Sequence, residues 1–486
     1  MARLSDWTDT ATAALREAGA RTASYLTPTL RLGVTGLARS GKTVLITALI
    51  RNLVSGGRLP FFAAMAEGRI ARTYLEPQPD DQVARFAYEE HLADLSCDPP
   101  QWPESTRAVS QLRLTVEFSS ANLLWRALGS GRLHIDIVDY PGEWLLDLPL
   151  IDLDFAQWSA RAVADTQARH HLPAARTWLA FLAAANAAGP PDEARAIEGA
   201  KLFTLYLQEA RASNSAAPVM PGPGRFLLPG DLAGSPLLTF FPLPPPATGG
   251  YPRASLGAML ARRYQSYKTH VVQPFFSDHF ARLDRQIVLV DALSAINAGP
   301  QALSELERTL AAVLACFKPG ANTWLSGILR RRIDRILFAA TKADHLHHTS
   351  HDRLEAGLRW LTDKAIARAE YAGAEVKVMA LAAVRATREA ERVSGRERLP
   401  CIVGMPLPGE RLGGRTFDGK TEAAVFPGDL PEDPTALLDR GDGEMVHFPR
   451  FRPPRLMPDT AAGDPAVLPH IRLDRAMEFL IGDKLA

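Results

Sequence analysis

A glycine-rich turn near the start of the chain constrains the fold more than any other feature. The segment RLGVTGLARSGKTVLITAL (31–49) places the octet GLARSGKT between an apolar run and a helix-like run. The octet fits the pattern G-x-x-x-x-G-K-[ST], whose glycines let the backbone curl so that successive N–H groups point at phosphate oxygens. The positive end of the following helix dipole favours the same ligand. We therefore expect a strand at 30–36, a phosphate-binding loop and a helix at 42–55.

Two side chains of this loop have distinct expected roles. Lys42 would bridge the β- and γ-phosphates of a nucleoside triphosphate, and the Thr43 hydroxyl would bind Mg²⁺. The residues expected to line the phosphates are Gly36, Ala38, Arg39, Ser40, Gly41, Lys42, Thr43 and Val44.

A second motif, HIDIVDYPGEW (134–144), supplies the carboxylate that such a magnesium site needs. Asp139 ends an apolar strand and begins a D-x-x-G pattern, so we expect it to hold Mg²⁺ and the Gly142 N–H to contact the γ-phosphate. Asp136 lies one strand period earlier but lacks the trailing glycine. Glu143 stands where a water-positioning glutamine often occurs, and we expect it to act in hydrolysis.

A third motif, TKAD (341–344), indicates that the base is guanine. A carboxylate at Asp344 would accept hydrogen bonds from the guanine N1–H and N2–H₂ groups, a pair that adenine does not offer. Thr341 and Lys342 complete the motif, and the lysine stem would stack on the base. The loop after the next strand places Ala383 and Val384 where backbone N–H groups could reach the base oxygen.

A switch threonine, which binds Mg²⁺ and responds to the γ-phosphate, should lie between the first helix and the strand at 111. Thr106 is the first candidate, for both metal binding and hydrolysis, ahead of Ser105 and Ser110. Arg107 beside it could neutralise charge in the transition state.

The order of apolar runs predicts an α/β fold. Strands are expected at 30–36, 111–118, 132–140, 286–293, 335–344 and 375–383. Helical sequence separates most of them, which is typical of a three-layer domain with a mainly parallel sheet, whereas 111–118 and 132–140 should form one antiparallel pair. The predicted P-loop GTPase-like core comprises 27–55, 111–145, 285–387 and 471–486. Mainly helical insertions comprise 56–110 and 146–284, and a small β-rich C-terminal module comprises 388–470.

Composition excludes several classes of protein. The 486 residues carry 55 basic and 54 acidic side chains, and this balance does not favour binding to nucleic acid. The three cysteines, at 97, 316 and 401, form no CxxC pair, which argues against structural zinc and suits a reducing cytoplasm. The amphipathic segment at 5–26 is predicted to be a helix and not a signal peptide, and no run is long enough to span a bilayer. Peripheral association with a membrane stays open.

Histidine and tryptophan residues raise two further questions. His345, His347 and His348 follow the TKAD motif, but no cysteine or second carboxylate cluster stands in sequence to complete a metal site, so we expect a solvated loop beside the base. Trp158 and Trp178 are expected in a core and not on a docking surface.

Several blocks together resemble the YcjX-like family of bacterial P-loop NTPases. They are GLARSGKTV, DYPGEWLLDLPL, VDAL, TKADH and the tail IRLDRAMEFLIGDKL. The resemblance implies a cytoplasmic GTPase-like protein with large helical insertions, a small extra domain and an association with stress responses.

The expected function is that of a regulatory switch. It would bind Mg²⁺ with GTP or GDP, hydrolyse GTP slowly, and contact an unidentified protein partner through the helical insertions. ATP remains an alternative ligand, so an ATPase stays open. A small-molecule kinase is less favoured, because the arginine-rich stretch RRIDR (331–335) leads straight into a strand. A nucleotide-stabilised scaffold with little turnover is the non-enzymatic alternative.

Overall fold

The structure is a computed structural model. It describes residues 27–57, 59–121, 131–213, 222–245, 250–278, 280–315, 333–394, 397–412, 414–438, 446–456 and 467–486. The predicted helix at 5–26 and Cys316 lie outside these ranges.

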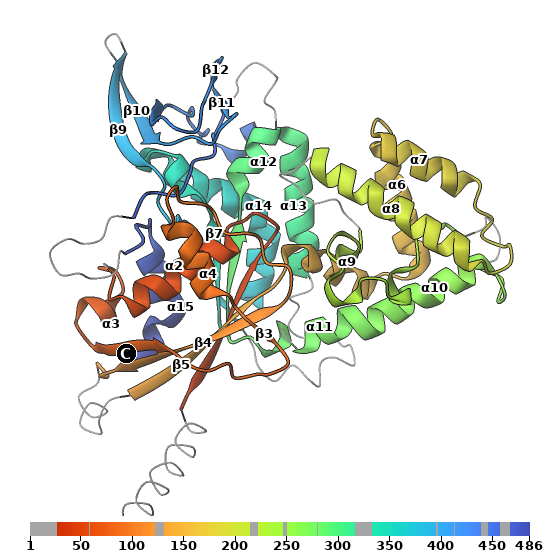
Figure 1. Ribbon diagram of the computed structural model, residues 1–486, viewed down its shortest axis with the longest axis horizontal. Helices are drawn as coiled ribbons and strands as arrows, with labels where there is room; N and C mark the ends of the chain where they lie inside the picture. Colours follow the sequence, from red (N-terminus) through yellow and green to blue (C-terminus); the bar gives the residue numbers. More distant parts are fainter. Residues whose placement is uncertain are drawn as a thin grey trace, which may run out of the picture.

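A mixed eight-stranded sheet forms the centre of the molecule, in the order β2-β4-β5-β1-β6-β7-β8, with β3 paired to β4 (Figure 1). Its strands are β1 (Thr29–Gly36), β2 (Ile70–Leu75), β3 (Ala84–Arg85), β4 (Ser110–Phe118), β5 (Gly131–Asp139), β6 (Arg285–Val290), β7 (Arg335–Ala340) and β8 (Glu375–Ala380). Strands β5, β1, β6, β7 and β8 run parallel to one another. The predicted antiparallel pairing of β4 with β5 is confirmed.

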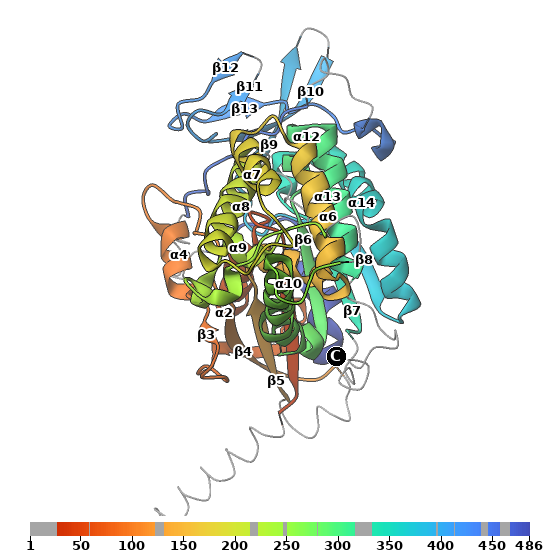
Figure 2. The ribbon, with the colours of Figure 1, turned by 90° about the vertical axis from the view of Figure 1, so that its right-hand side faces the viewer.

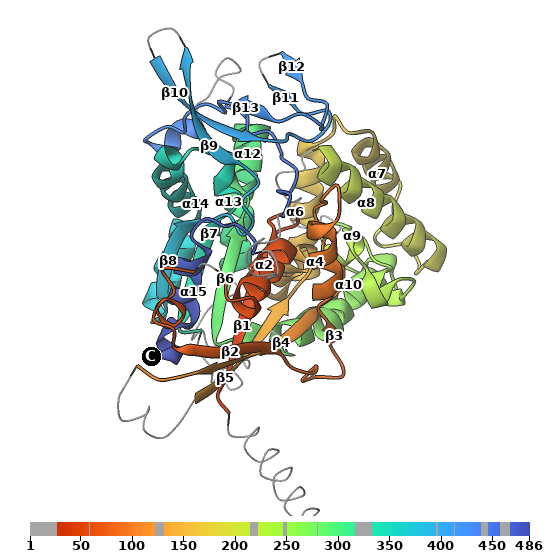
Figure 3. The ribbon, with the colours of Figure 1, turned by 60° about the vertical axis from the view of Figure 1, so that its left-hand side comes forward.

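Two layers of helices cover the sheet. On one face, α2 (Lys42–Val54), α3 (Ala63–Ala66), α4 (Tyr88–Ser96) and α15 (Leu473–Ile481) share a core with the strands. On the other face lie α12 (Ala292–Ala298), α13 (Pro300–Ala315) and α14 (His351–Tyr371). Alternate residues of β6 belong to the two cores, since Ile287 and Leu289 pack with the first group and Val288 and Val290 with the second. Figure 3 gives a second view of α2 and α15 against the strands. The expected three-layer α/β fold is confirmed.

Two strands of the sheet, β2 and the two-residue β3, were not expected from the sequence. The segment 56–110, predicted to be mainly helical, contains β2, which pairs antiparallel with β4 and adds a second antiparallel pair to the sheet. Its sequence IARTYL lies at the sheet edge with only Thr73 fully buried. An edge strand with one buried position lacks the alternation of apolar and polar residues by which strands are recognised. The sequence therefore did not predict β2.

The long helical insertion forms a lobe with its own core beside the sheet (Figures 1 and 2). Its helices are α6 (Phe155–Ala168), α7 (Pro173–Ala183), α8 (Glu193–Ser213), α9 (Gly224–Leu227), α10 (Leu256–Tyr267) and α11 (Gln273–Asp278), with a π-turn at Lys268–Val272 between the last two. Trp158 and Trp178 are fully buried in this core, as the sequence predicted. The Trp158 ring stacks on Tyr264 at 5.0 Å between centroids.

A β-rich module lies between α14 and the C-terminal helix in sequence. Strands β9 (Arg388–Ser394), β10 (Glu397–Gly404) and β13 (Ala423–Val425) form an antiparallel sheet, and β11 (Arg411–Leu412) pairs with β12 (Arg415–Thr416). The chain then returns to the core, where the buried Arg285 guanidinium of β6 donates to the Leu480 carbonyl and pairs with Asp334 and Asp483. Among the described helices, none has both the length and the apolarity to cross a bilayer.

The insertion core generates a stability prediction. Replacing Trp158 by alanine leaves a cavity among Phe203, Phe240 and Tyr264 and should lower the free energy of unfolding by about 3–5 kcal/mol. Urea denaturation followed by far-ultraviolet circular dichroism measures this change. Leu205→Ala, at a position on α8 that is 45% exposed, serves as the control and should change it by no more than about 0.5 kcal/mol. Equal losses in the two variants would contradict a packed insertion core.

Candidate nucleotide-binding site

The glycine-rich turn leaves β1 at Gly36 and enters α2 at Lys42. Gly41 has φ 91°, in the left-handed region that favours glycine. A Cβ on Gly36 would lie 2.7 Å from the Leu289 carbonyl oxygen of β6, so the turn also needs glycine there to pack against the sheet. Lys42 Nζ folds back over the turn and donates to the Gly36 carbonyl oxygen at 2.9 Å. The segment therefore forms a tight turn with its lysine held across it.

Buried hydroxyl and carboxylate oxygens gather next to this lysine. Thr43 Oγ1 lies 3.3 Å from Thr106 Oγ1, and Thr106 in turn donates a hydrogen bond to Asp139 Oδ2. Asp139 ends β5, which runs parallel to β1 with Val34 opposite Asp139. The structure thus brings together the three residues that the sequence analysis proposed as metal ligands.

The electrostatics of this group fit a cation. Asp139 is fully buried, and its Oδ1 atom has no hydrogen-bond partner among the described residues. Burial raises the pKa of Asp139 to about 6, although the charge of Lys42 and the bond from Thr106 oppose the shift. Burial lowers the pKa of Lys42, against the attraction of Asp139. An orphaned carboxylate oxygen beside two hydroxyls matches the oxygen ligands that Mg²⁺ prefers.

The alternative carboxylate, Asp136, is already paired. Its two oxygens accept from Arg113 on the adjacent strand β4 at 2.6 and 2.8 Å. Arg107, considered as a charge-neutralising group, is exposed and forms an ion pair with Glu104 at 2.9 Å. Ser105 is exposed, and Ser110 is the first residue of β4. Ser110 lies opposite Asp139 in the β4–β5 register, and the Thr106 hydroxyl donates a hydrogen bond to the Asp139 carboxylate.

The D-x-x-G segment lies directly on the glycine-rich turn. A Cβ on Gly142 would be 2.5 Å from Ala38 N and 2.6 Å from the Leu37 carbonyl carbon, so only glycine allows this approach. Glu143, the next residue, has a side chain that is 10% exposed and forms an ion pair with Arg211 of α8. The charge of Arg211 also acts on Lys42, where it helps to lower the lysine pKa. No sequence signal marked Arg211, because it lies 68 residues from Glu143.

The helical insertion packs on the same segment. A Cβ on Gly224 would overlap the Glu143 carbonyl oxygen, and the Gly224 N–H donates to Asp147 Oδ1 at 2.7 Å. The Arg225 guanidinium lies over the Trp144 ring, 3.2 Å from its centroid. The turn of residues 142–147 therefore lies between the glycine-rich turn and the helical insertion.

The TKAD segment follows β7 and meets the loop after β8. Asp344 is buried, and its Oδ2 atom accepts from Ala386 N at 2.8 Å. Lys342 has φ 62° and forms an ion pair with Asp291, the residue after β6. The predicted base contacts are close by, since Ala343 N donates to the Leu381 carbonyl, with Ala383 and Val384 just beyond it.

The sheet brings these loops to one edge. Strand β6 lies between β1 and β7, and all three run parallel. Their carboxyl ends therefore point to the same side. Gly36, Asp291 and Thr341 each stand at or directly after one of these ends.

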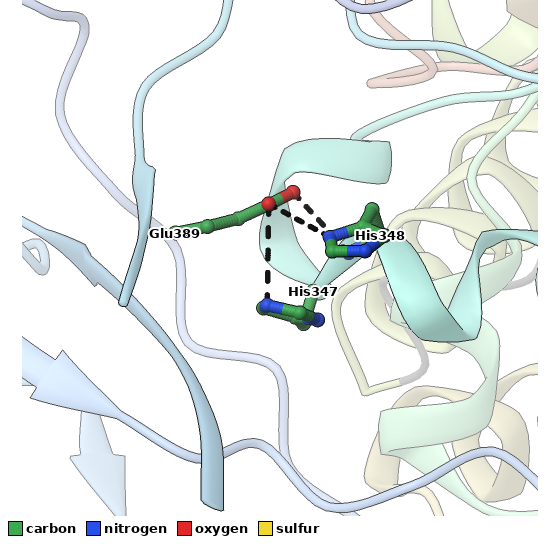
Figure 4. A group of neighbouring side chains, drawn as sticks. All are labelled: His347, His348 and Glu389. Atoms are coloured by element: carbon green, nitrogen blue, oxygen red, sulfur yellow. Dashed lines mark hydrogen bonds and ion pairs between the residues drawn. The ribbon is translucent and has the colours of Figure 1, made fainter. Parts of the chain in front are cut away.

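The three histidines separate into two environments. His345 is 6% exposed and packs edge-on against Phe451, so the expectation of a solvated loop is wrong for it. The cause is the β-rich module, which covers this loop and which the sequence did not place. His347 and His348 face Glu389 of β9 (Figure 4). Glu389 lies 41 residues from His348 and was not considered as its neighbour.

The buried carboxyl Asp147 generates a prediction on pH dependence. Burial raises the pKa of Asp147 to about 7, although the hydrogen bond from Gly224 favours the charged form. The folded protein therefore keeps a proton that the unfolded chain has lost, so this group's contribution to stability disappears as the pH rises from about 4 to about 7. Asp147→Asn keeps an acceptor for Gly224 and should remove this loss, which is on the order of a few kcal/mol.

The comparison is urea denaturation of wild-type and Asp147→Asn proteins at pH 5 and pH 8. The difference between the two pH values should shrink in Asp147→Asn and stay unchanged in the exposed control Asp81→Asn. An identical pH dependence in all three proteins would show that Asp147 is ionised in the folded state.

Comparison with known proteins shows the family to which the chain is related. A family model described as "YcjX-like family, DUF463" matches residues 30–485. A protein named "Ras-like GTPase YcjX" from Escherichia coli (strain K12) is 38% identical over 468 residues, covering 94% of this chain and 96% of the relative. A protein of the same name from Shewanella oneidensis is 34% identical over 482 residues, covering 94% of each chain.

A solved structure, the signal recognition particle receptor SRb-GTP/SRX complex from Chaetomium thermophilum, aligns with 74% of this chain and 92% of its own. The identity is 13% and the TM-score is 0.24. The family match and the two relatives extend along almost the whole sequence. This chain therefore belongs to the YcjX-like family.

Proposed function

We propose that this protein is a Mg²⁺-dependent GTPase. The observation that carries the proposal is the group formed by buried Lys42, Thr43 and Asp139 with half-buried Thr106 beside the glycine-rich turn, in which Asp139 Oδ1 has no hydrogen-bond partner among the described residues. The two relatives named "Ras-like GTPase YcjX" support the same activity. In this proposal the N–H groups of residues 38–44 and the Lys42 ammonium bind the phosphates.

Thr43, Thr106 and Asp139 would hold the metal ion. Bound Mg²⁺ would neutralise charge on the β- and γ-phosphates. The Gly142 N–H would contact the γ-phosphate, because its backbone already touches residues 37 and 38. Loss of that phosphate would remove the contact and free the turn of residues 142–147.

We propose that Glu143 and Arg211 act in hydrolysis. Glu143 would orient the attacking water, and Arg211 would stabilise the charge that develops on the phosphates, as an arginine supplied by the same chain. In the structure the two side chains neutralise each other in an ion pair. Turnover would require this pair to open, which is consistent with a slow GTPase.

Base selection would depend on Asp344. Its Oδ2 atom is fixed by Ala386 N, which orients the carboxylate. A carboxylate at this position favours guanine over adenine, so we propose that GTP and GDP bind in preference to ATP. Ala383 and Val384 would supply backbone N–H groups to the base oxygen.

The helical insertion would transmit the state of the nucleotide. It contacts residues 143–147 through Arg211, Gly224 and Arg225. A change in the conformation of residues 143–147 would therefore alter how the insertion packs on the core. We propose a regulatory switch that acts in the cytoplasm on a protein partner bound by this insertion, with peripheral membrane association as a further option. The association with bacterial stress responses is supported by the family resemblance.

The base-specificity prediction uses Asp344→Asn. The amide keeps an acceptor for Ala386 N but offers the guanine N–H groups a donor in place of one acceptor. The affinity for GTP should fall at least about tenfold, the loss expected for one hydrogen bond to a charged group, while weak ATP binding stays unchanged. Calorimetric titration with each nucleotide in Mg²⁺ measures both affinities, and Asp363→Asn on the exposed side of α14 is the control.

Each result of that experiment separates the alternatives. A wild-type protein that binds ATP as tightly as GTP would contradict guanine selectivity and favour an ATPase. Selective GTP binding without any release of phosphate would favour the scaffold.

A kinetic prediction tests the arginine from the insertion. Arg211→Ala should lower single-turnover hydrolysis of GTP by about 10³-fold, the lower end of the effect of such arginines, with little change in GTP affinity. Arg211→Lys should recover only part of the rate, because an ammonium cannot reproduce the planar fork of donors. Arg262→Ala, at an exposed position on α10, should behave as wild type. An Arg211→Ala protein that hydrolyses GTP at the wild-type rate or faster would exclude this role.

A further inference from the structure

A cluster of nitrogen and oxygen ligand atoms lies outside the nucleotide site, at the junction of the core and the β-rich module. His347 and His348 precede α14, and Glu389 reaches them from β9 (Figure 4). His348 Nδ1 is 2.8 Å from Glu389 Oε2, and His347 Nε2 is 3.9 Å from the same oxygen. Ligand atoms of all three residues lie within 4.8 Å of one another.

These distances suit a tetrahedral metal ion. Zinc binds imidazole nitrogen and carboxylate oxygen at about 2.0–2.1 Å, so neighbouring ligand atoms in a tetrahedron are about 3.4 Å apart. The two separations from Glu389 Oε2 lie on either side of this value. The ligand atoms of the three side chains are therefore spaced close to the separations that a tetrahedral ion requires.

The surroundings orient two of the ligands. His347 Nδ1 lies 3.1 Å from Thr349 Oγ1, which leaves Nε2 directed at Glu389. The His348 backbone N–H donates to Glu389 Oε1 at 3.2 Å and so holds the carboxylate on the histidine side. Contacts of this kind fix the ligands in known metal sites.

We propose that His347, His348 and Glu389 form a binding site for a divalent transition-metal ion, with Zn²⁺ as the best match. Imidazole ligands select zinc, copper or nickel over magnesium, so this site is distinct from the proposed nucleotide-linked Mg²⁺ site. Three protein ligands leave the fourth position to water. The Arg385 guanidinium, 3.8 Å from Glu389 Oε1, adds positive charge nearby, so we expect moderate rather than very tight affinity.

The ion would join two segments that already contact each other. Asp344 accepts from Ala386 N through its side chain and from Thr387 Oγ1 through its carbonyl oxygen. His348 is also bonded to Glu389, and a bound ion would reinforce this link between residues 344–348 and 386–389. A bound ion would therefore stiffen the junction between the β-rich module and the loop that carries Asp344.

The direct test is titration of the full-length, chelator-treated protein with Co²⁺ and Zn²⁺ in excess Mg²⁺ and without nucleotide. We expect one Co²⁺ per chain with the visible absorption of a tetrahedral site, displaced by one equivalent of Zn²⁺. Glu389→Gln and His348→Ala should each weaken Zn²⁺ binding at least tenfold. His270→Ala, which removes an exposed histidine of the insertion, should leave it unchanged.

Hydrogen exchange supplies a second measurement in the same samples. Zn²⁺ should slow amide exchange in residues 344–348 and 386–389 of the wild type but not of Glu389→Gln. Absence of saturable binding, or binding that is equal in the wild type and both ligand variants, would overturn the proposal. Because the readouts need neither GTP binding nor hydrolysis, a failure here is distinguishable from a failure of the GTPase proposal.

Discussion

The close approach of the backbone at Gly142 to the turn at residues 37 and 38 is the contact on which the rest of the site depends. It requires a glycine at position 142, because a Cβ there would overlap main-chain atoms of residues 36–38. Gly36 is needed for a different contact, since a Cβ there would overlap Leu289 of β6. The parallel pairing of β1 with β5 brings the two segments together. Asp139 and Lys42 then become neighbours in a space without bulk water, where opposite charges interact strongly.

This contact also connects the helical insertion to the proposed nucleotide site. Arg211, Gly224 and Arg225 of the insertion all contact residues 143–147, directly after Gly142. A shift of Gly142 relative to the turn would therefore disturb these contacts. Residues 142–147 would contact the nucleotide on one side and position the separate helical lobe on the other.

Local patterns in the sequence were sufficient to predict those segments of the candidate site whose residues are contiguous in the sequence. The glycine-rich octet, the strand ending at Asp139 and the TKAD segment each carry their own spacing, and in the structure they follow or end the parallel strands β1, β5 and β7 of one sheet. The roles proposed for the residues of these three motifs, and for Thr106, Glu143, Ala383 and Val384, remain predictions.

Features that arise from tertiary packing could not be predicted from local sequence patterns. Strand β2 has one fully buried side chain, so its edge position depends on β4 and not on its own pattern. Arg211 and Glu389 approach their partners across 68 and 41 residues, and nothing near either residue in the sequence marks it. His345 is buried because a separate module covers it.

The central claim is that the turn at residues 36–43 binds the phosphates of a guanine nucleotide through its amides and Lys42. Calorimetric titration of wild-type and Lys42→Ala proteins with GTP, GDP and ATP in Mg²⁺ tests it most directly. The account predicts saturable binding of GTP and GDP by the wild type, weak or no binding of ATP, and loss of GTP binding in a Lys42→Ala protein that stays folded. A wild-type protein that binds no guanine nucleotide, or a Lys42→Ala protein that binds GTP as tightly as wild type, would contradict it.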